Sequence, residues 1–516
     1  MPFVSIFNDV LGPVMRGPSS SHTAGSHRLG RIARSLLGDE PASAVFTFDP
    51  EGSYARTYRE QGADLGFAAG LLGWPITDER FPQALGTADR AGIKIEFKLH
   101  PLPLADHPNT VLIELAGRGG KRLEMIGQSV GGGLVVVRRV DDWDVEITGK
   151  SHDTLVMCDI PVVPGVKALA ERWKALLHST KEAARGDRAL LHFQSAEDPG
   201  GENLEKLRRL SGVHDVRSVP PVFFVQRGEP LFTSGEEMIA RAAGRRISLG
   251  RTALEYESRL LGFSEKEAEE EMLRRWDIMA AAVERGTKDR DLKLRLLRPS
   301  AANILDAEMR GTLALGGPAT RAAARALAVV HVSNSGGVVC AAPTGASSGV
   351  VPGVVATLIE TKKLSSERIA WALFAASAVG LVIAARATFA AEVAGCQVEI
   401  GAAGAMASAA AVEAMGGTAR QALDAAAISL QNSMGSVCDL VQGLCEIPCH
   451  TRNAAAAASA LVCADLVLGG YVNPVPLDET VDAVFAVGKM LPRELRCTSL
   501  GGLAMTPSAQ ALRRLK

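Results

Sequence analysis

The chain has 516 residues, which at roughly 150 residues per domain suggests about three domains and excludes a single small module. Hydrophobic residues make up 47% of the sequence and charged residues 22%, so a large core can form and global disorder is excluded. The net charge of -1, without a basic block, argues against nucleic acid as a partner. The first residues lack the pattern of a signal peptide, so we expect a cytoplasmic protein.

Residues 1–150 mix strand and helix patterns, which predicts an N-terminal α/β domain. The helical patterns lie at 27–37 and 63–72. Short runs typical of strands lie at 44–50, 110–117, 132–140 and 144–149.

Residues 151–228 predict a second, smaller domain with the order strand, helix, strand, strand, helix, strand, which is the ferredoxin-like arrangement. The domain resembles the amino-acid-sensing ACT domains, and a spacer without a ligand is an equally good interpretation. The predicted strands are 154–161, a weak one near His178, 188–195 and 216–222, and the predicted helices are 166–177 and 204–210.

Residues 229–516 predict an all-α catalytic domain of Ala-rich helices separated by Gly, Ser and Pro loops, beginning with helices at 236–243, 253–261 and 264–285. The uncharged run 369–385 has the minimum length for a membrane span. Its Ala, Gly and Ser content favours a buried central helix instead. We therefore expect a multidomain α+β fold and no membrane contact.

Four cysteines of the helical part, Cys396, Cys438, Cys445 and Cys449, lie in loop-like segments. In a reducing compartment, cysteines are more often free, catalytic or metal-bound than paired. Their spacing matches neither a zinc ribbon nor a ferredoxin run, and soft thiolates suit zinc or an iron–sulfur centre. For any single cysteine, the better interpretation is a small buried hydrophobic side chain.

Six motifs occur in an order that resembles the iron–sulfur-dependent L-serine dehydratases (L-serine ammonia-lyases), in the form that carries the beta and alpha parts on one chain. These motifs are GPSSSHTAGSHRLGRIA, HPNTVLIEL, VVCAAPTGASSGVVPGV, AGCQVEIGAA, CDLVQGLCEIPCHTRNA and LGGLAMTP. The resemblance implies a [4Fe–4S] cluster held by Cys396, Cys438 and Cys449, with one iron left open as a Lewis acid for the β-hydroxyl of serine. The implied products are pyruvate and ammonia.

The hydroxyl and backbone N–H groups of Ser19, Ser20, Ser21 and Thr23 precede a predicted helix and suit a substrate carboxylate, although an ordinary N-cap loop would look the same. With the resemblance, we expect this loop to bind the substrate. His22 and His107 are the candidate catalytic residues, although His107 also fits a turn before a proline. The remaining candidate substrate-binding residues are Asn109, Asn334, Thr344, Arg452 and Asn453, of which Arg452 is the second carboxylate partner or a buried structural arginine.

Two departures concern the substrate. Gln61 and Ala63 stand where the family has a histidine and a threonine, and a Gly-Gly-Asp segment is replaced by LLRPSAANILDAEM. A related iron–sulfur lyase for another β-substituted amino acid and a non-catalytic amino-acid-binding regulator therefore stay as alternatives. No lysine motif or phosphate-cradling glycine loop supports a pyridoxal-phosphate enzyme. We expect a small amino acid as the substrate and a homo-oligomer, namely a dimer, and we assign no role to Cys340, Cys445 and Cys497.

Overall fold

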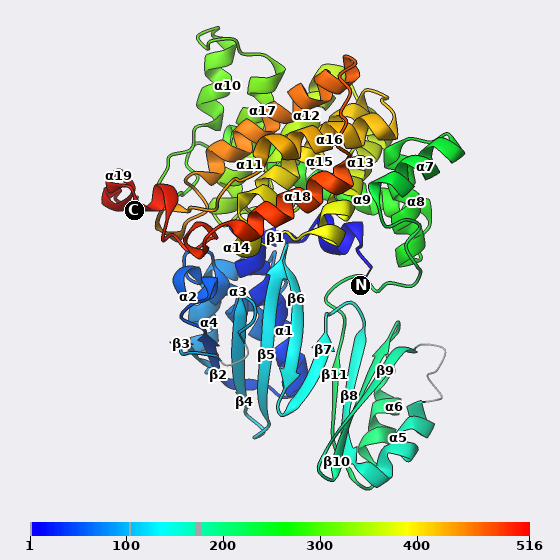
Figure 1. Cartoon of the computed structure of the whole chain (residues 1–516). Helices are drawn as coiled ribbons and strands as arrows, with labels where there is room; N and C mark the ends of the chain where they lie inside the picture. The colour runs from blue at the N-terminus through cyan, green and yellow to red at the C-terminus, as the bar shows by residue number, and fades with distance from the viewer. Residues whose placement is uncertain (1–2, 103–104, 171–176, 516) are drawn as a thin grey trace.

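The computed structural model describes residues 3–102, 105–170 and 177–515. Helices fill the upper part of the molecule, a six-stranded sheet with its helices lies below them, and a four-stranded sheet lies beside the latter (Figure 1). The chain is therefore a mixed α and β protein, as the sequence indicates.

The six-stranded sheet has the order β3-β2-β4-β5-β6-β7, and only β2 and β3 are parallel. Four of its strands correspond to predicted ones, whereas β3 and β5 were missed. Helices α1 and α3 cover the sheet and touch through glycines, since a Cβ atom at Gly70 would lie 2.4 Å from the His27 carbonyl oxygen. The elements are α1 (Gly25–Leu37), β2 (Pro41–Phe48), α2 (Ser53–Thr57), α3 (Ala63–Leu71), α4 (Ala84–Arg90), β3 (Lys94–Leu99), β4 (Thr110–Gly117), β5 (Arg122–Gly131), β6 (Leu134–Val140) and β7 (Trp143–Ile147).

The four-stranded sheet is antiparallel in the order β11-β8-β10-β9. Along the chain, strands and helices alternate in the order expected from the sequence. The predicted helix 166–177 is wrong at its end, because Leu177 already belongs to a strand, and 171–176 lie outside the described residues. The elements are β8 (His152–Asp159), α5 (Val163–Ala170), β9 (Leu177–Arg185), β10 (Arg188–Ser195), α6 (Gly201–Arg208) and β11 (Val213–Val219).

The helical part is not purely helical. Strand β12 (Val338–Cys340) pairs with β1 (Val14–Arg16), and the π-helical turn Ile6–Val10 is buried in the helical core. The first residues of the chain, which were expected in the N-terminal domain, thus pack with the helical part. The expectation that residues 229–516 form an all-α unit by themselves is therefore corrected. The helices are α7 (Gly235–Arg245), α8 (Leu249–Leu261), α9 (Glu265–Lys288), α10 (Ala301–Met309), α11 (Pro318–Asn334), α12 (Val350–Lys362), α13 (Ser366–Arg386), α14 (Ala391–Ala394), α15 (Ile400–Ala414), α16 (Ala419–Ser433), α17 (Cys449–Leu468), α18 (Leu477–Met490) and α19 (Pro507–Ala511).

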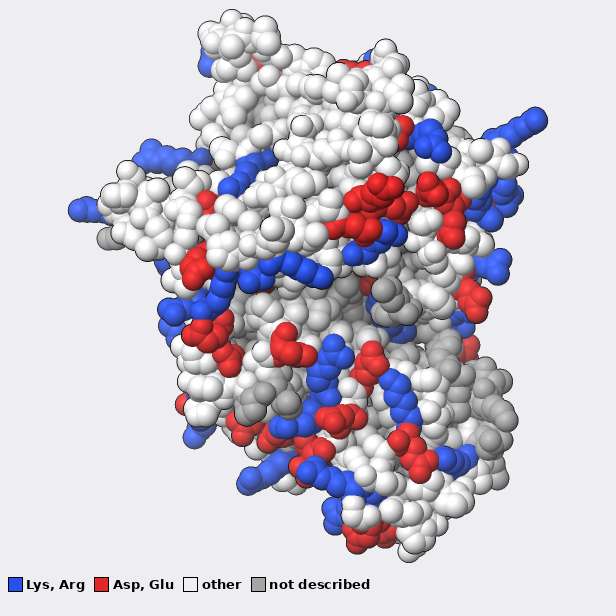
Figure 2. All heavy atoms as spheres, in the orientation of Figure 1, with Lys and Arg blue, Asp and Glu red and all other residues white. Residues whose placement is uncertain are grey.

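Two helices, α13 and α17, are long and apolar enough to cross a membrane by length and composition. In α13, 78% of the most apolar window is buried inside the protein, as in the core helix of a globular fold. In α17 the buried share is 33%, and the upper helical part shows a broad uncharged surface in Figure 2, whereas charged residues crowd the lower part.

Candidate active site

Four cysteines and one glutamate meet in a buried place that we call the cysteine site: Cys396, Cys438, Cys449, Cys497 and Glu399. All of the cysteines are free and buried. The Sγ atoms of Cys396 and Cys438 and a carboxylate oxygen of Glu399 lie within 4.8 Å of one another. Cys396 lies between α14 and α15, and Cys449 is the first residue of α17. Segments distant in sequence thus bring their sulfur atoms together.

The pKa values of these groups are shifted by burial and by the neighbouring thiols and carboxylate. Burial raises the pKa of Cys449 well above its usual range, and it raises the pKa of Glu399 in the same way. The pKa of Cys438 rises mainly through hydrogen bonds with Cys396 and Cys497, whereas that of Cys396 falls through its bond with Cys438. Several thiolates can form here only with a compensating cation, so the donor set fits a soft metal centre.

Arg452 supports the loop that carries Cys438. Its Nη1 donates to the Val437 carbonyl oxygen at 2.7 Å and lies 3.6 Å from Cys396 Sγ. Its Nη2 lies 3.0 Å from Asp439 Oδ1. The forked guanidinium already has protein partners on the cysteine loop. This geometry favours a structural arginine over the predicted partner of a substrate carboxylate.

His22 is completely buried and faces Glu392, a residue that the sequence analysis did not select. His22 Nδ1 lies 3.5 Å from Glu392 Oε1, and His22 Nε2 lies 2.9 Å from Thr57 Oγ1. Burial lowers the pKa of His22 to about 3, so its imidazole is neutral at neutral pH. A neutral imidazole can accept a proton.

The predicted serine loop and Asn109 meet at this histidine. Ser20, Ser21 and Thr23 belong to a buried π-helical turn that starts after Ser19, whose Oγ accepts the His22 backbone N–H at 3.1 Å. Asn109 Nδ2 donates to Glu392 Oε1 at 3.1 Å, which links the sheet to α14. The serine loop, Asn109, His22 and Glu392 therefore form one group at the junction of the two parts of the chain.

Two further predicted residues position the loop that precedes α12. Asn453 donates to the carbonyl oxygens of Ala346 at 2.8 Å and Cys449 at 2.9 Å, so it ties this loop to α17. Thr344 is hydrogen-bonded to Ser347 and to Glu399. Thr344 thus reaches the cysteine site directly, and Asn453 reaches it through the backbone.

The side chains of His107 and Asn334 have hydrogen-bond partners other than His22, Glu392 and the cysteines. His107 Nδ1 accepts the backbone N–H of Asn109 at 3.1 Å, as a turn histidine does. Asn334 Nδ2 donates to Val330 O at 3.0 Å and lies 3.2 Å from His450 Nε2. Their predicted roles in catalysis and substrate binding stay predictions.

Gln61 connects the serine loop with the cysteine site. Its carbonyl oxygen accepts the Thr23 hydroxyl at 2.7 Å, and its Nε2 lies 3.5 Å from Cys497 Sγ. Gln61, a departure from the family pattern, is therefore in contact with Cys497, to which the sequence analysis assigned no role.

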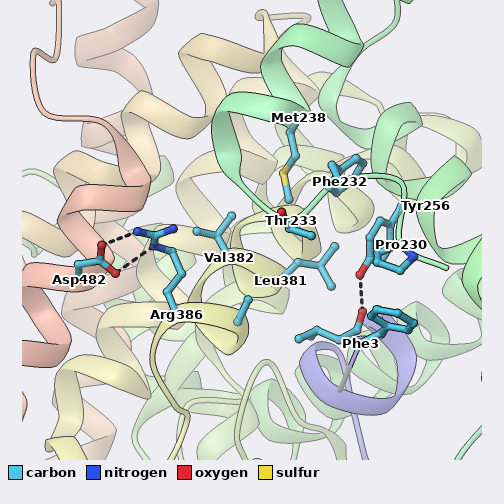
Figure 3. Close-up of a pocket in the computed structure, with 12 residues that line it drawn as sticks. Phe3, Pro230, Phe232, Thr233, Met238, Tyr256, Leu381, Val382, Arg386 and Asp482 are labelled. Carbon is cyan, nitrogen blue, oxygen red and sulfur yellow. Dashed lines mark hydrogen bonds and ion pairs between the residues drawn. The ribbon is translucent and has the colours of Figure 1, made fainter. Parts of the chain in front are cut away.

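A cavity of about 290 Å³ leads to the cysteine site from outside, between α15, α16 and α17. It is lined by Cys396, Gly401, Gly404, Ser429, Ser433 and Arg452, among others. A larger cavity of about 540 Å³ is lined mainly by apolar side chains, including Phe232, Met238 and Leu381, and contains no cysteine (Figure 3). Only the smaller of these two gives small molecules a path to Cys396.

Comparisons with known proteins identify the class of this chain. A family model described as the serine dehydratase alpha chain matches residues 180–504. A probable L-serine dehydratase alpha chain of Bacillus subtilis is 35% identical over 285 residues, which are 55% of this chain and 95% of that protein. A probable beta chain from the same organism is 34% identical over 224 residues, 42% of this chain and 99% of that protein. L-serine dehydratase 2 of Escherichia coli is 32% identical over 249 residues, 47% of this chain and 55% of that protein.

These matches define an enzyme of the lyase class. More particularly, the chain belongs to the L-serine dehydratase family, and one polypeptide is similar to both the alpha and the beta chain types. The sequence motifs alone had indicated this family. Glu392 and Glu399 were missed, although they are the only charged residues between 387 and 412 and that isolation was the available signal.

Proposed function

We propose that the chain is a cytoplasmic, [4Fe–4S]-dependent L-serine ammonia-lyase that converts L-serine to pyruvate and ammonia. The observation that carries the proposal is the meeting of Cys396 and Cys438 in a dry site beside the buried serine loop, with Cys449 buried and close enough to interact electrostatically with Cys396, in a chain of this family. The three thiolates would hold the cluster. When bound, it supplies a Lewis acid that makes the β-hydroxyl of serine a better leaving group.

His22 is our proposed base for the α-proton of the substrate. Its Nδ1 lies 3.4 Å from Ser19 Oγ and 3.5 Å from Glu392 Oε1, both longer than ordinary hydrogen bonds, so this nitrogen is available for a proton. His22 takes the α-proton and passes it to the β-hydroxyl, which leaves as water, so an enamine remains and His22 is neutral again. The enamine tautomerises to an imine, which water hydrolyses to pyruvate and ammonia. Ser19, Ser20, Ser21 and Thr23 hold the substrate in this proposal, and Asn453 and Thr344 position the neighbouring loop.

One observation favours a related second function. The Gln61 amide contacts Cys497 at the place where the family resemblance implies a histidine. An amide cannot act as a base, so the same site would suit an amino acid with another β-substituent. Comparing L-serine with L-threonine and L-cysteine as substrates separates the two functions.

Residues 151–228 form, in our proposal, an ACT-like unit between the N-terminal domain 1–150 and the catalytic domain 229–516. Its support is the antiparallel strand order β11-β8-β10-β9 with two helices. Such units often pair their sheets, which favours a homodimer.

Anaerobic purification tests the main proposal. We expect a brown protein with iron and sulfide that releases pyruvate from L-serine, and a Cys396→Ala variant that loses the iron and the activity. Cys463→Ala is the matched control, because Cys463 is buried on α17 beside Ser459. A colourless protein with stoichiometric zinc would refute the proposal.

A further inference from the structure

Three buried oxygen atoms near His22 have no hydrogen-bond partner. They are Glu392 Oε2, Asn109 Oδ1 and Ser20 Oγ. Their residues are 4%, 0% and 1% exposed, respectively, so bulk solvent does not reach them. Buried polar atoms in native proteins nearly always have a partner, and three orphaned oxygens in one neighbourhood need an explanation.

Hydrogen bonds tie the three residues into one place. The other oxygen of Glu392 accepts Asn109 Nδ2 at 3.1 Å, and the Glu392 side chain is also hydrogen-bonded to Ser21, the neighbour of Ser20. Ser129 of β5 donates its hydroxyl to the Ser21 carbonyl oxygen at 2.7 Å and its backbone N–H to the Asn109 carbonyl oxygen at 3.2 Å. The sheet, the serine loop and α14 are thus fixed around the unpaired oxygens.

The chemistry of these atoms specifies the missing group. A carboxylate oxygen and an amide oxygen only accept hydrogen bonds, so their partner must donate several. Among the described residues, the only ion-pair partner of Glu392 is His22, which is neutral at neutral pH because burial lowers its pKa to about 3. Burial raises the pKa of Glu392, because an ionised carboxylate is costly there without a positive charge, and a bound cation would stabilise the ionised form.

We propose that Glu392 Oε2, Asn109 Oδ1 and Ser20 Oγ bind the α-ammonium group of the amino-acid substrate. A primary ammonium has three N–H donors and one positive charge, which match three acceptors and one carboxylate. Glu392 then contacts His22 through one oxygen and the ammonium through the other, which places the α-carbon beside the imidazole. This assignment rests on the proposed function only in taking an amino acid as the substrate of this site.

Calorimetric titration of the holoenzyme with L-alanine and with propanoate tests the assignment without turnover, because these ligands differ only in the ammonium group. We expect the wild type to bind L-alanine at least about tenfold more tightly than propanoate, as charge-assisted hydrogen bonds require. Glu392→Gln should weaken L-alanine binding at least about tenfold and leave propanoate binding unchanged. Glu413→Gln is the matched control, because Glu413 is a buried glutamate that instead accepts the Gly250 backbone N–H.

Three outcomes would overturn the assignment. The first two are unchanged L-alanine binding in Glu392→Gln and an equal loss of binding for L-alanine and propanoate in this variant. The third is a Glu392→Gln variant that no longer binds potassium in a titration with potassium chloride but still binds L-alanine, because the three oxygens would then bind a metal cation. If Glu392→Gln does not fold, Ser20→Ala replaces it, with an expected loss of about threefold or more for L-alanine alone. Absence of pyruvate release with a retained ammonium preference would refute the proposed function and leave this inference standing.

Discussion

Cys438 and Cys497 are held side by side by their backbones: the Cys497 N–H donates to the Cys438 carbonyl oxygen at 3.0 Å, and the Cys438 N–H donates to the Leu495 carbonyl oxygen at 2.8 Å. Their thiols are also hydrogen-bonded. The segment that follows α18 therefore closes one wall of the cysteine site. Cys497, which is not one of the three proposed ligands, thus lies within reach of them.

The three-ligand assignment predicts that Cys497→Ala keeps its iron and sulfide, whereas Cys438→Ala loses both. The reason is that a cluster held by three thiolates does not need a fourth, while loss of one of the three leaves too few soft donors. Iron and sulfide analysis and visible absorption of anaerobic samples measure the difference. Loss of iron from Cys497→Ala would show that Cys497 is a ligand and that the assignment is wrong.

Arg452 is predicted to protect the metal centre instead of binding substrate. Arg452→Lys removes the fork that joins Val437, Asp439 and Cys396 but keeps the charge. Changes in groups that orient metal ligands typically weaken metal binding by about tenfold to 100-fold, so we expect iron to pass to a chelator about tenfold faster. The KM for L-serine should change by less than about twofold.

Arg325→Lys is the control for this experiment, because Arg325 pairs with Glu360 and Thr357 on α12. It should leave both the iron transfer and the KM as in the wild type. A large rise in KM for Arg452→Lys with normal iron retention would restore the predicted role of Arg452 as a carboxylate partner.

The sequence predicted most of the regular elements because their apolar patterns are local. Strand β10 (Arg188–Ser195) lies where its RALLHFQS pattern indicates. Strand β3 (Lys94–Leu99) was missed because it is an edge strand with exposed lysines, and β5 because glycines interrupt its pattern. The pairing of Val14–Arg16 with Val338–Cys340 joins distant segments, and three-residue strands carry too little periodicity to reveal it.

The candidate site was predicted unevenly for a related reason. Ordered motifs led to Cys396 and Cys438, and the structure brings their sulfur atoms together. The contact between Glu392 and His22 could not be predicted, since it depends on how α14 docks against the serine loop. Likewise, the partners of Arg452 are backbone and loop atoms whose positions only the fold determines.

Buried neutral histidines should each lower the stability of the protein in mild acid, a contribution that can be measured one histidine at a time. Burial lowers the pKa of His22 to about 3 and those of His27, His107 and His331 to about 4, against 6.5 in the unfolded chain. Between these values the unfolded chain binds protons at these histidines that the native state does not, so their contribution to the free energy of unfolding falls as pH falls below about 6.5. At pH 5.5 each such histidine costs about 1.4 kcal/mol relative to neutral pH.

Urea unfolding at pH 7.5 and 5.5 measures this difference. In His27→Gln, the fall in the free energy of unfolding between the two pH values should be smaller by about 1.4 kcal/mol than in the wild type. The Trp74 carbonyl oxygen, now 2.7 Å from His27 Nε2, can still accept a hydrogen bond from the glutamine amide. An identical fall in both proteins would show that His27 does not contribute.

Helices α9 and α11 pack closely at Gly286, and we therefore expect Gly286→Ala to lower the free energy of unfolding. A Cβ atom there would lie 2.0 Å from the carbonyl oxygen of Ala328 on α11, so Gly286→Ala must push the two helices apart. Overpacking of this kind costs about 1–3 kcal/mol in the free energy of unfolding. At Gly244 of α7, a Cβ atom would meet nothing within 4 Å, and Gly244→Ala should stabilise by about 0.5–1 kcal/mol because alanine favours a helix. Urea unfolding of the two variants should therefore give changes of opposite sign, and a stabilised Gly286→Ala would mean that α9 and α11 are not packed this closely.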